Sequence, residues 1–186
     1  QRQRVVDICA EIMRRGLDVG WDVRARVNTV DEELARLMRA AGCERIHYGV
    51  EAGTDRVLKI LRKGITVEQV RHTFRLTKAA GIDTLAYFII GSPTETYQDI
   101  LQTMKLAREL NPDYVHITIM TPFPGTALYF QGLEQGVISH DCWREFAANP
   151  RPDFQPPYWE ENFSREELLE LIDAAYRDFY LRPGYI

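Results

Sequence analysis

The chain has 186 residues, 45% of them hydrophobic and 27% charged, which is enough apolar material for the core of one globular unit. Its net charge is −4, and its 23 basic residues are scattered among 27 acidic ones, so no basic stripe follows a phosphate backbone and nucleic-acid binding is not indicated. No apolar run approaches the roughly 20 residues of a membrane span, and the first residues lack a secretory signal, so we expect a cytoplasmic protein.

The three cysteines, Cys9, Cys43 and Cys142, are widely spaced and form no CxxC or CxxxCxxC pair. This spacing argues against a disulfide framework and against a self-contained metal site, and it predicts three ordinary, partly buried thiols. The sequence begins with Gln1, and its first segment already has the pattern of a helix. We therefore expect a piece of a longer protein.

The first third of the chain predicts a helix, a strand and a second helix. Apolar residues at helical spacing predict a helix over residues 5–13, and an alternating run that starts at Trp21 predicts a short strand. Thr29 and Glu32 have the spacing of a capping box, which predicts a helix that ends at Gly42.

The next segment repeats this order. Residues 45–51 alternate as a strand, and a short helix is expected over residues 55–61. Thr66 and Gln69 form a second predicted capping box, at the start of a helix that runs up to Gly81.

Two further strands follow with their helices. Residues 84–90 are an apolar run suited to a buried parallel strand, and the helix after it, which begins near Tyr97, ends before Asn111. Residues 114–120 predict another strand, and a weaker helix is expected over residues 127–134. This strict alternation predicts right-handed crossovers and a parallel sheet or barrel in the α/β class.

The last part of the chain differs in composition. Residues 149–157 are too rich in proline for a regular element, and Ser164 with Glu167 predicts the capped start of a final helix. We therefore divide the chain into an incomplete β/α barrel over residues 1–148 and a Pro-rich tether with a C-terminal helix over residues 149–186.

Each of three predicted strands has one polar face. These polar positions are Asp22, Arg24 and Arg26; His47, Gly49 and Glu51; and Tyr114, His116 and Thr118. Inside a barrel, burying such groups raises the free energy of the folded state unless they are hydrogen-bonded, ion-paired or hydrated. A lumen that binds a polar ligand is therefore the preferred interpretation. The alternative is an open sheet with one solvated face.

Glu51 is the strongest single candidate for a ligand-binding residue. It is the last residue of its predicted strand, and ligand sites of α/β folds lie at the carboxyl ends of strands. A carboxylate there accepts both hydroxyls of a ribose, although a purely structural carboxylate is equally compatible. His47 and His116 fit hydrogen-bonded core histidines as well as a substrate lumen. Gly91 in the GSPTET segment allows close backbone approach to a ligand, with Thr94 and Glu95 starting the next helix, and the rigid TPFPGT loop offers carbonyls for a purine edge.

Three segments together are specific: GVEAGTDRVLKILRKGIT, AAGIDTLAYFIIGSPTET and NPDYVHITIMTPFPGT, in this order and at these spacings. They resemble the radical S-adenosylmethionine (radical SAM) superfamily, most closely the members that carry a cobalamin-binding domain ahead of the barrel. The resemblance covers residues 21–129 and implies a partial parallel barrel made of strands three to six of a (β/α)6 barrel, with C-terminal helices. Residues 1–15 would be the helix before the third strand.

The resemblance implies a set of cofactor-binding residues. Glu51 matches the ribose ligand, Arg24 or Arg26 would reach the ribose or the methionyl carboxylate, and Lys63 matches a basic position that faces this carboxylate. The other implied positions lie around the adenine: Tyr87, Ile89, Gly91 and Thr121. His47 and His116 would line the substrate lumen, and no catalytic residue is assigned.

In this family, a [4Fe-4S] cluster on a CxxxCxxC loop and bound SAM generate a 5′-deoxyadenosyl radical, and cobalamin would make methyl transfer the outcome. The loop is absent from this sequence, so we expect a fragment that is inactive by itself. Its parent is expected to act on a small-molecule or unidentified substrate. The alternative is a degenerate, non-catalytic nucleotide-binding or scaffolding barrel. A hydrolytic or isomerising barrel has little support, because no Gly-rich phosphate loop is present.

The resemblance has a consequence for assembly. Without the first two strands, the third would present an unpaired edge, which predicts self-association or pairing with another chain.

Overall fold

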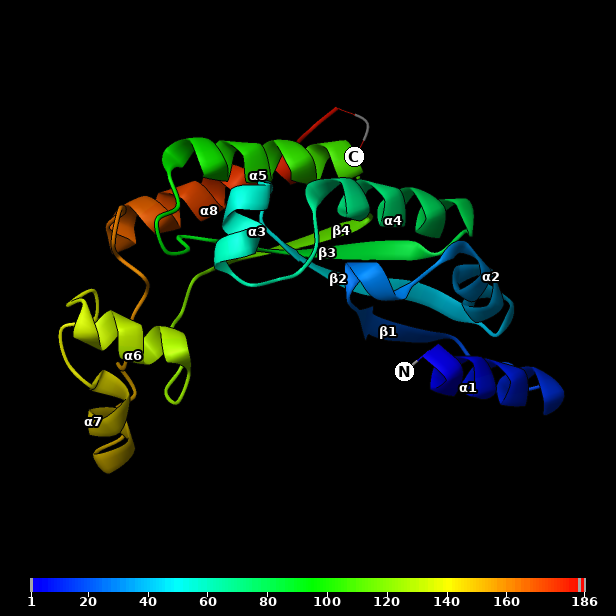
Figure 1. Cartoon of the computed structure of the whole chain (residues 1–186), viewed down its shortest axis with the longest axis horizontal. Helices are drawn as coiled ribbons and strands as arrows, with labels where there is room; N and C mark the ends of the chain where they lie inside the picture. Colours follow the sequence, from blue (N-terminus) through cyan, green and yellow to red (C-terminus); the bar gives the residue numbers. More distant parts are fainter. Residues whose placement is uncertain (1, 184, 186) are drawn as a thin grey trace.

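Four parallel strands form the centre of the computed structural model, which describes residues 2–183 and 185. They are β1 (Trp21–Ala25), β2 (Cys43–Glu51), β3 (Asp83–Ile90) and β4 (Tyr114–Ile119), hydrogen-bonded in the order β1-β2-β3-β4 (Figure 1). Each consecutive pair is parallel. The predicted α/β alternation and the parallel pairing are confirmed.

The helices of the described residues occupy the connections and the two ends of the chain. They are α1 (Arg2–Arg14), α2 (Glu32–Ala40), α3 (Asp55–Ile60), α4 (Val67–Ala79), α5 (Tyr97–Leu110), α6 (Ala127–Glu134), α7 (Cys142–Ala148) and α8 (Arg165–Tyr180), with a 3₁₀ turn, η1 (Val27–Thr29). Helix α7 was not predicted. Across the described part of the chain, we find no helix with the length and apolar character needed to span a membrane.

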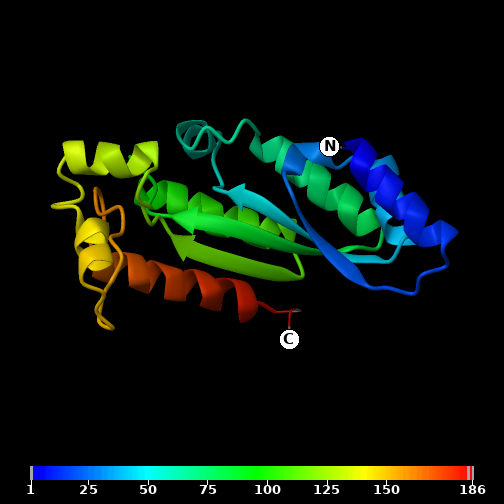
Figure 2. The same cartoon turned by 90° about the horizontal axis from the view of Figure 1, so that it is seen from below.

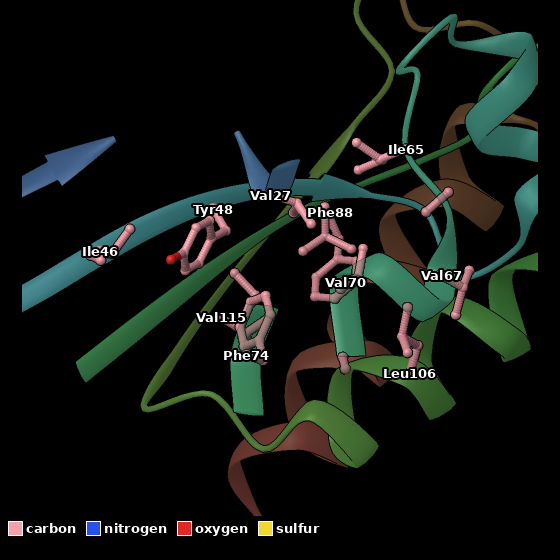
Figure 3. Packing of buried hydrophobic residues seen from close by; sticks show 14 of the residues in the cluster. Val27, Ile46, Tyr48, Ile65, Val67, Val70, Phe74, Phe88, Leu106 and Val115 are labelled. Atoms are coloured by element: carbon pink, nitrogen blue, oxygen red, sulfur yellow. The ribbon is translucent and has the colours of Figure 1, made fainter. Parts of the chain in front are cut away.

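One face of the sheet packs into the hydrophobic core. Alternate residues of β2 (Ile46, Tyr48 and Val50) are fully buried. Figure 3 shows the packing of this core, in which the Tyr48 ring lies 5.3 Å from the ring of Phe74 on α4. The Tyr48 hydroxyl is 2.8 Å from the Thr77 hydroxyl, so the one polar atom of this buried ring is satisfied.

Two of the three predicted capping boxes are confirmed, at Thr66 of α4 and at Ser164 of α8. The box predicted at Thr29 is wrong. Residues 27–29 are taken up by the turn η1, in which the Thr29 hydroxyl donates to the Arg26 carbonyl at 2.7 Å. The helix therefore starts later, and the Asp31 carboxylate caps it by accepting from the Leu34 amide at 2.8 Å.

The C-terminal segment packs against the sheet. Trp159, two residues after the Pro-rich stretch, is 1% exposed, and its amide donates to the Met120 carbonyl just after β4 at 3.0 Å. Leu168 and Phe179 of α8 belong to the same hydrophobic core as the strands. In Figure 2, α8 runs alongside β4.

The cap at Asp31 can be tested by substitution. We expect Asp31→Ala to lower the free energy of unfolding by about 1 kcal/mol, because the Leu34 amide loses its acceptor. The measurement is urea denaturation of Asp31→Ala beside Thr29→Ala, which removes a hydroxyl and a methyl group from an exposed turn. A larger loss in Thr29→Ala than in Asp31→Ala would contradict this assignment of the cap.

Candidate functional site

The face of the sheet opposite the core carries the polar side chains. Arg24 and His116 are exposed, while His47 and Tyr87 are half-buried. They alternate with the buried residues of β2 to β4 and with the half-buried residues of β1. This is the alternation that the sequence predicts. No strand or helix closes this sheet into a full barrel within the described residues.

At the carboxyl end of β2, the Glu51 and Lys63 side chains form an ion pair, with 16% and 22% of their surfaces exposed. Glu51 has a φ of 75°, a left-handed conformation that is unfavourable for a residue with a side chain. It follows an irregularity in the register between β2 and β3. The backbone turn aims the carboxylate back over the polar face of the strand, towards Gly49.

Gly49 leaves room for this pair. A Cβ atom at Gly49 would stand 2.6 Å from Oε1 of Glu51 and 2.9 Å from Nζ of Lys63, which is too close for either atom to remain in place. Arg26 joins the same group, because its guanidinium donates to the Lys63 carbonyl. The structure thus brings together three of the predicted cofactor residues, Glu51, Lys63 and Arg26. Arg24, two residues before Arg26 on the polar face, is paired with His47 in the strand register.

A row of polar groups crosses the middle of the same face. Nδ1 of His47 lies 3.3 Å from the Tyr87 hydroxyl, and the Tyr87 and His116 rings are 5.5 Å apart. On the other side, Nε2 of His47 is 3.6 Å from Oδ2 of Asp22, and this buried nitrogen has no hydrogen-bond partner among the described residues. The row offers donors and acceptors to a polar ligand on this face.

The structure gives Gly91 a packing role at the end of β3. Its φ is 75°, and a Cβ atom there would stand 2.8 Å from Cδ2 of Leu168 on α8. Ile89, two residues earlier, is half-buried on the polar face. Thr121, after β4, is half-buried, and its hydroxyl donates to the Ile119 carbonyl at 3.1 Å.

The prediction that Thr94 and Glu95 start the next helix is wrong. Helix α5 is capped by Thr96, which forms a capping box with Asp99. Glu95 instead turns into the protein, where it is 0% exposed and accepts from the Ser92 amide at 2.8 Å. In the sequence, Glu95 follows GSPT and has the ordinary pattern of an acidic residue in the first turn of a helix. The sequence therefore carried no signal that this side chain is buried.

The Glu95 carboxyl is expected to titrate near neutral pH. Burial raises its pKa from 4.5 to about 7, although hydrogen bonds from the Ser92 and Gly91 amides act in the opposite direction. Its Oε1 atom has no hydrogen-bond partner among the described residues. A protonated carboxyl is therefore the favoured form below neutral pH.

The loop after β3 is tied to α3 by Arg56. The guanidinium donates to the Thr94 carbonyl at 3.0 Å and pairs with Asp99, which is itself mostly buried. Burial acts to raise the pKa of Asp99, but the hydrogen bonds from Arg56 and Thr96 outweigh it and hold the pKa at about 2. Thr94 is thereby held at a φ of 56°, and the ends of β2 and β3 are fixed relative to each other.

Glu95 makes stability depend on pH. Because its pKa is higher in the folded chain than in the unfolded chain, the free energy of unfolding should be greatest below about pH 4.5 and fall by up to about 3 kcal/mol as the pH rises through 7. Glu95→Gln stays neutral and should flatten this part of the profile in denaturation measured from pH 5 to 8. The exposed Glu134→Gln is the control. A wild-type profile that is already flat over this range would contradict a buried, titrating Glu95.

Comparison with known proteins identifies the family. The family model described as "Radical SAM superfamily" matches residues 2–107. An uncharacterized methyltransferase of Pyrococcus horikoshii is 35% identical over 98% of this chain and 39% of the relative. The anaerobic magnesium-protoporphyrin IX monomethyl ester cyclase of Rubrivivax gelatinosus is 32% identical over 100% of this chain and 32% of the relative.

Solved structures share the fold. The radical SAM methyltransferase TsrM from Kitasatospora setae, with cobalamin and a [4Fe-4S] cluster bound, matches with a TM-score of 0.62 and 24% identity over 74% of this chain and 28% of that chain. Coproporphyrinogen III oxidase from Escherichia coli matches with a TM-score of 0.65 and 16% identity over 97% of this chain and 37% of that chain. The chain therefore spans between about a quarter and two fifths of these proteins. From the family match, the relatives and the shared parallel sheet, we conclude that this chain belongs to the radical SAM superfamily.

Proposed function

We propose that this chain forms the nucleoside-binding part of a radical SAM enzyme. The observation that carries the proposal is the position of the Glu51 carboxylate over the polar face at the end of β2. The left-handed backbone at Glu51 directs the side chain there, and the missing side chain at Gly49 leaves room for it. In this proposal its two oxygens accept the two ribose hydroxyls of SAM. Lys63 holds the carboxylate in place before the ligand arrives, and with Arg26 or Arg24 it then faces the methionyl carboxylate.

The adenine would lie against the end of β3. Ile89 offers an apolar side chain on the polar face, Tyr87 lies two residues before it on the strand, and Gly91 directly follows the strand. Thr121 would meet the adenine edge from the loop after β4. The row of His47, Tyr87 and His116 lies deeper on the same face, where we place the small-molecule substrate.

The residues of this chain do not fit the [4Fe-4S] cluster. Cys9 and Cys43 are buried, and Cys142 lies on α7. Burial raises the pKa of the Cys43 thiol to about 12, which opposes the thiolate that a cluster requires. In the described part of the chain, no three His, Cys, Asp or Glu residues are grouped to hold a metal ion. The cluster would therefore be bound by residues outside this sequence, and this chain alone would be inactive.

Methyl transfer assisted by cobalamin is the outcome we propose for the whole enzyme. Supporting it are the Pyrococcus relative, which is named a methyltransferase, and the cobalamin-bound state of the structurally similar TsrM. The cytoplasmic location stays a prediction.

The second candidate is a nucleotide-binding or scaffolding barrel without chemistry. The scattered and partly buried cysteines favour it for this chain taken alone. The two candidates differ in whether the longer protein holds a cluster.

The test of the proposed function is reconstitution. The longer protein that contains this chain is expressed anaerobically, supplied with iron and sulfide, reduced and given SAM. We expect a visible absorption band from the cluster and release of 5′-deoxyadenosine. A colourless protein that releases none but still binds SAM would favour the scaffolding alternative.

A second test addresses the ribose site. Glu51→Gln in the reconstituted protein should weaken SAM binding by about tenfold or more, because an amide replaces a charged acceptor of two hydroxyls. The measurement is isothermal titration with SAM, with the absorption band of the cluster as a check that the protein is assembled. Glu44→Gln, an exposed glutamate on the same strand, is the matched control. Equal affinities in the two variants would remove Glu51 from the site.

A further inference from the structure

The outer edge of β4 needs a partner. In the described sheet, β4 pairs with β3 alone, so the other side of the strand presents backbone amides and carbonyls. An edge of this kind is a template for pairing with another chain. The strand is YVHITI, with no acidic side chain, lysine, arginine or proline, and with β-branched residues at four of its six positions, a composition that favours such pairing.

Two tyrosines of α8 bind this edge. The Tyr180 hydroxyl is 3.0 Å from the Val115 amide nitrogen and 2.9 Å from the Val115 carbonyl oxygen. The Tyr176 hydroxyl is likewise 3.0 Å from the Ile117 amide nitrogen and 3.1 Å from the Ile117 carbonyl oxygen. A phenol both donates and accepts, so one hydroxyl satisfies both backbone groups of one residue.

The two spacings match. Tyr176 and Tyr180 are four residues apart on a helix, about 6 Å along its axis, and Val115 and Ile117 are two residues apart on a strand, about 6.6 Å along it. The helix runs in the opposite direction to the strand, because the later tyrosine meets the earlier strand residue. An i, i+4 pair of tyrosines is thus in register with the backbone groups of Val115 and Ile117 that point away from β3.

Neighbouring contacts hold the tyrosines in this position. Their rings are 6.1 Å apart and nearly parallel, at 13°. Phe179, between them in sequence, is 1% exposed, and the Tyr185 hydroxyl donates to the Asp113 carbonyl at 2.6 Å, just before β4. Helix α8 therefore occupies the place of a fifth strand (Figure 2).

We propose that the Tyr176 and Tyr180 hydroxyls seal the β4 edge, and that the partner which pairs with β4 when the seal is removed is a second copy of this chain. Two copies of an uncharged strand can meet through the same edge about a two-fold axis. At the opposite end of the sheet, β1 pairs only with β2 among the described strands, but it carries the exposed charges of Asp22 and Arg24. The seal is independent of the proposed enzymatic function.

The first measurement is amide hydrogen exchange of this chain and of Tyr176→Phe/Tyr180→Phe, which keeps both rings. We expect the Val115 and Ile117 amides to exchange roughly tenfold faster in the double variant, about the change in an equilibrium that follows from losing one hydrogen bond. Tyr176→Phe should affect Ile117, and Tyr180→Phe should affect Val115. Tyr97→Phe, at an exposed position on α5, is the control. Unchanged exchange at both amides would overturn the seal.

The second measurement is the molar mass by light scattering over a range of concentrations. The double variant should reach a larger assembly than the wild type, and adding His116→Lys in β4 should return it to the wild-type mass, because lysine on an edge strand opposes pairing. Site-specific exchange in the single variants separates this effect from general unfolding. Fast exchange in a double variant that keeps the wild-type mass would overturn the second copy as the partner.

Discussion

The alternation of side chains along four parallel strands is the constraint on which the rest of this structure depends. Once Ile46, Tyr48 and Val50 are buried in the hydrophobic core, the intervening residues of β2 must lie on the other face. The charged and hydrogen-bonding groups of the neighbouring strands lie on that same face. The polar surface is thus a direct consequence of how the core is packed.

Backbone strain is concentrated at the carboxyl edge of this sheet. Glu51 and Thr94 both have left-handed conformations that are unfavourable for residues with a side chain. Each is held by a cation, Lys63 for the carboxylate of Glu51 and Arg56 for the carbonyl of Thr94. Strain that is held in place by specific contacts is typical of functional sites, and here it falls where α/β folds bind ligands.

The two ends of the sheet are protected by different means. Charged side chains stand on β1, and tyrosine hydroxyls cover β4. At β1 the charges of the side chains oppose pairing, whereas at β4 the backbone groups are themselves hydrogen-bonded by the tyrosine hydroxyls.

The sequence by itself determined the strands, two of the capping boxes and the polar face, because each depends on spacing within a few residues. The parallel pairing was predicted from the alternation of strands and helices along the chain. The sequence also placed Glu51 at the end of its strand. Only the tertiary structure decided that Asp31 rather than Thr29 caps α2, since η1 takes up the preceding residues. It likewise decided that Glu95 is buried and that Tyr176 and Tyr180 meet Val115 and Ile117, some 60 residues away. Contacts between distant segments leave no periodic signal in one sequence, because they depend on how the elements pack and not on their local pattern.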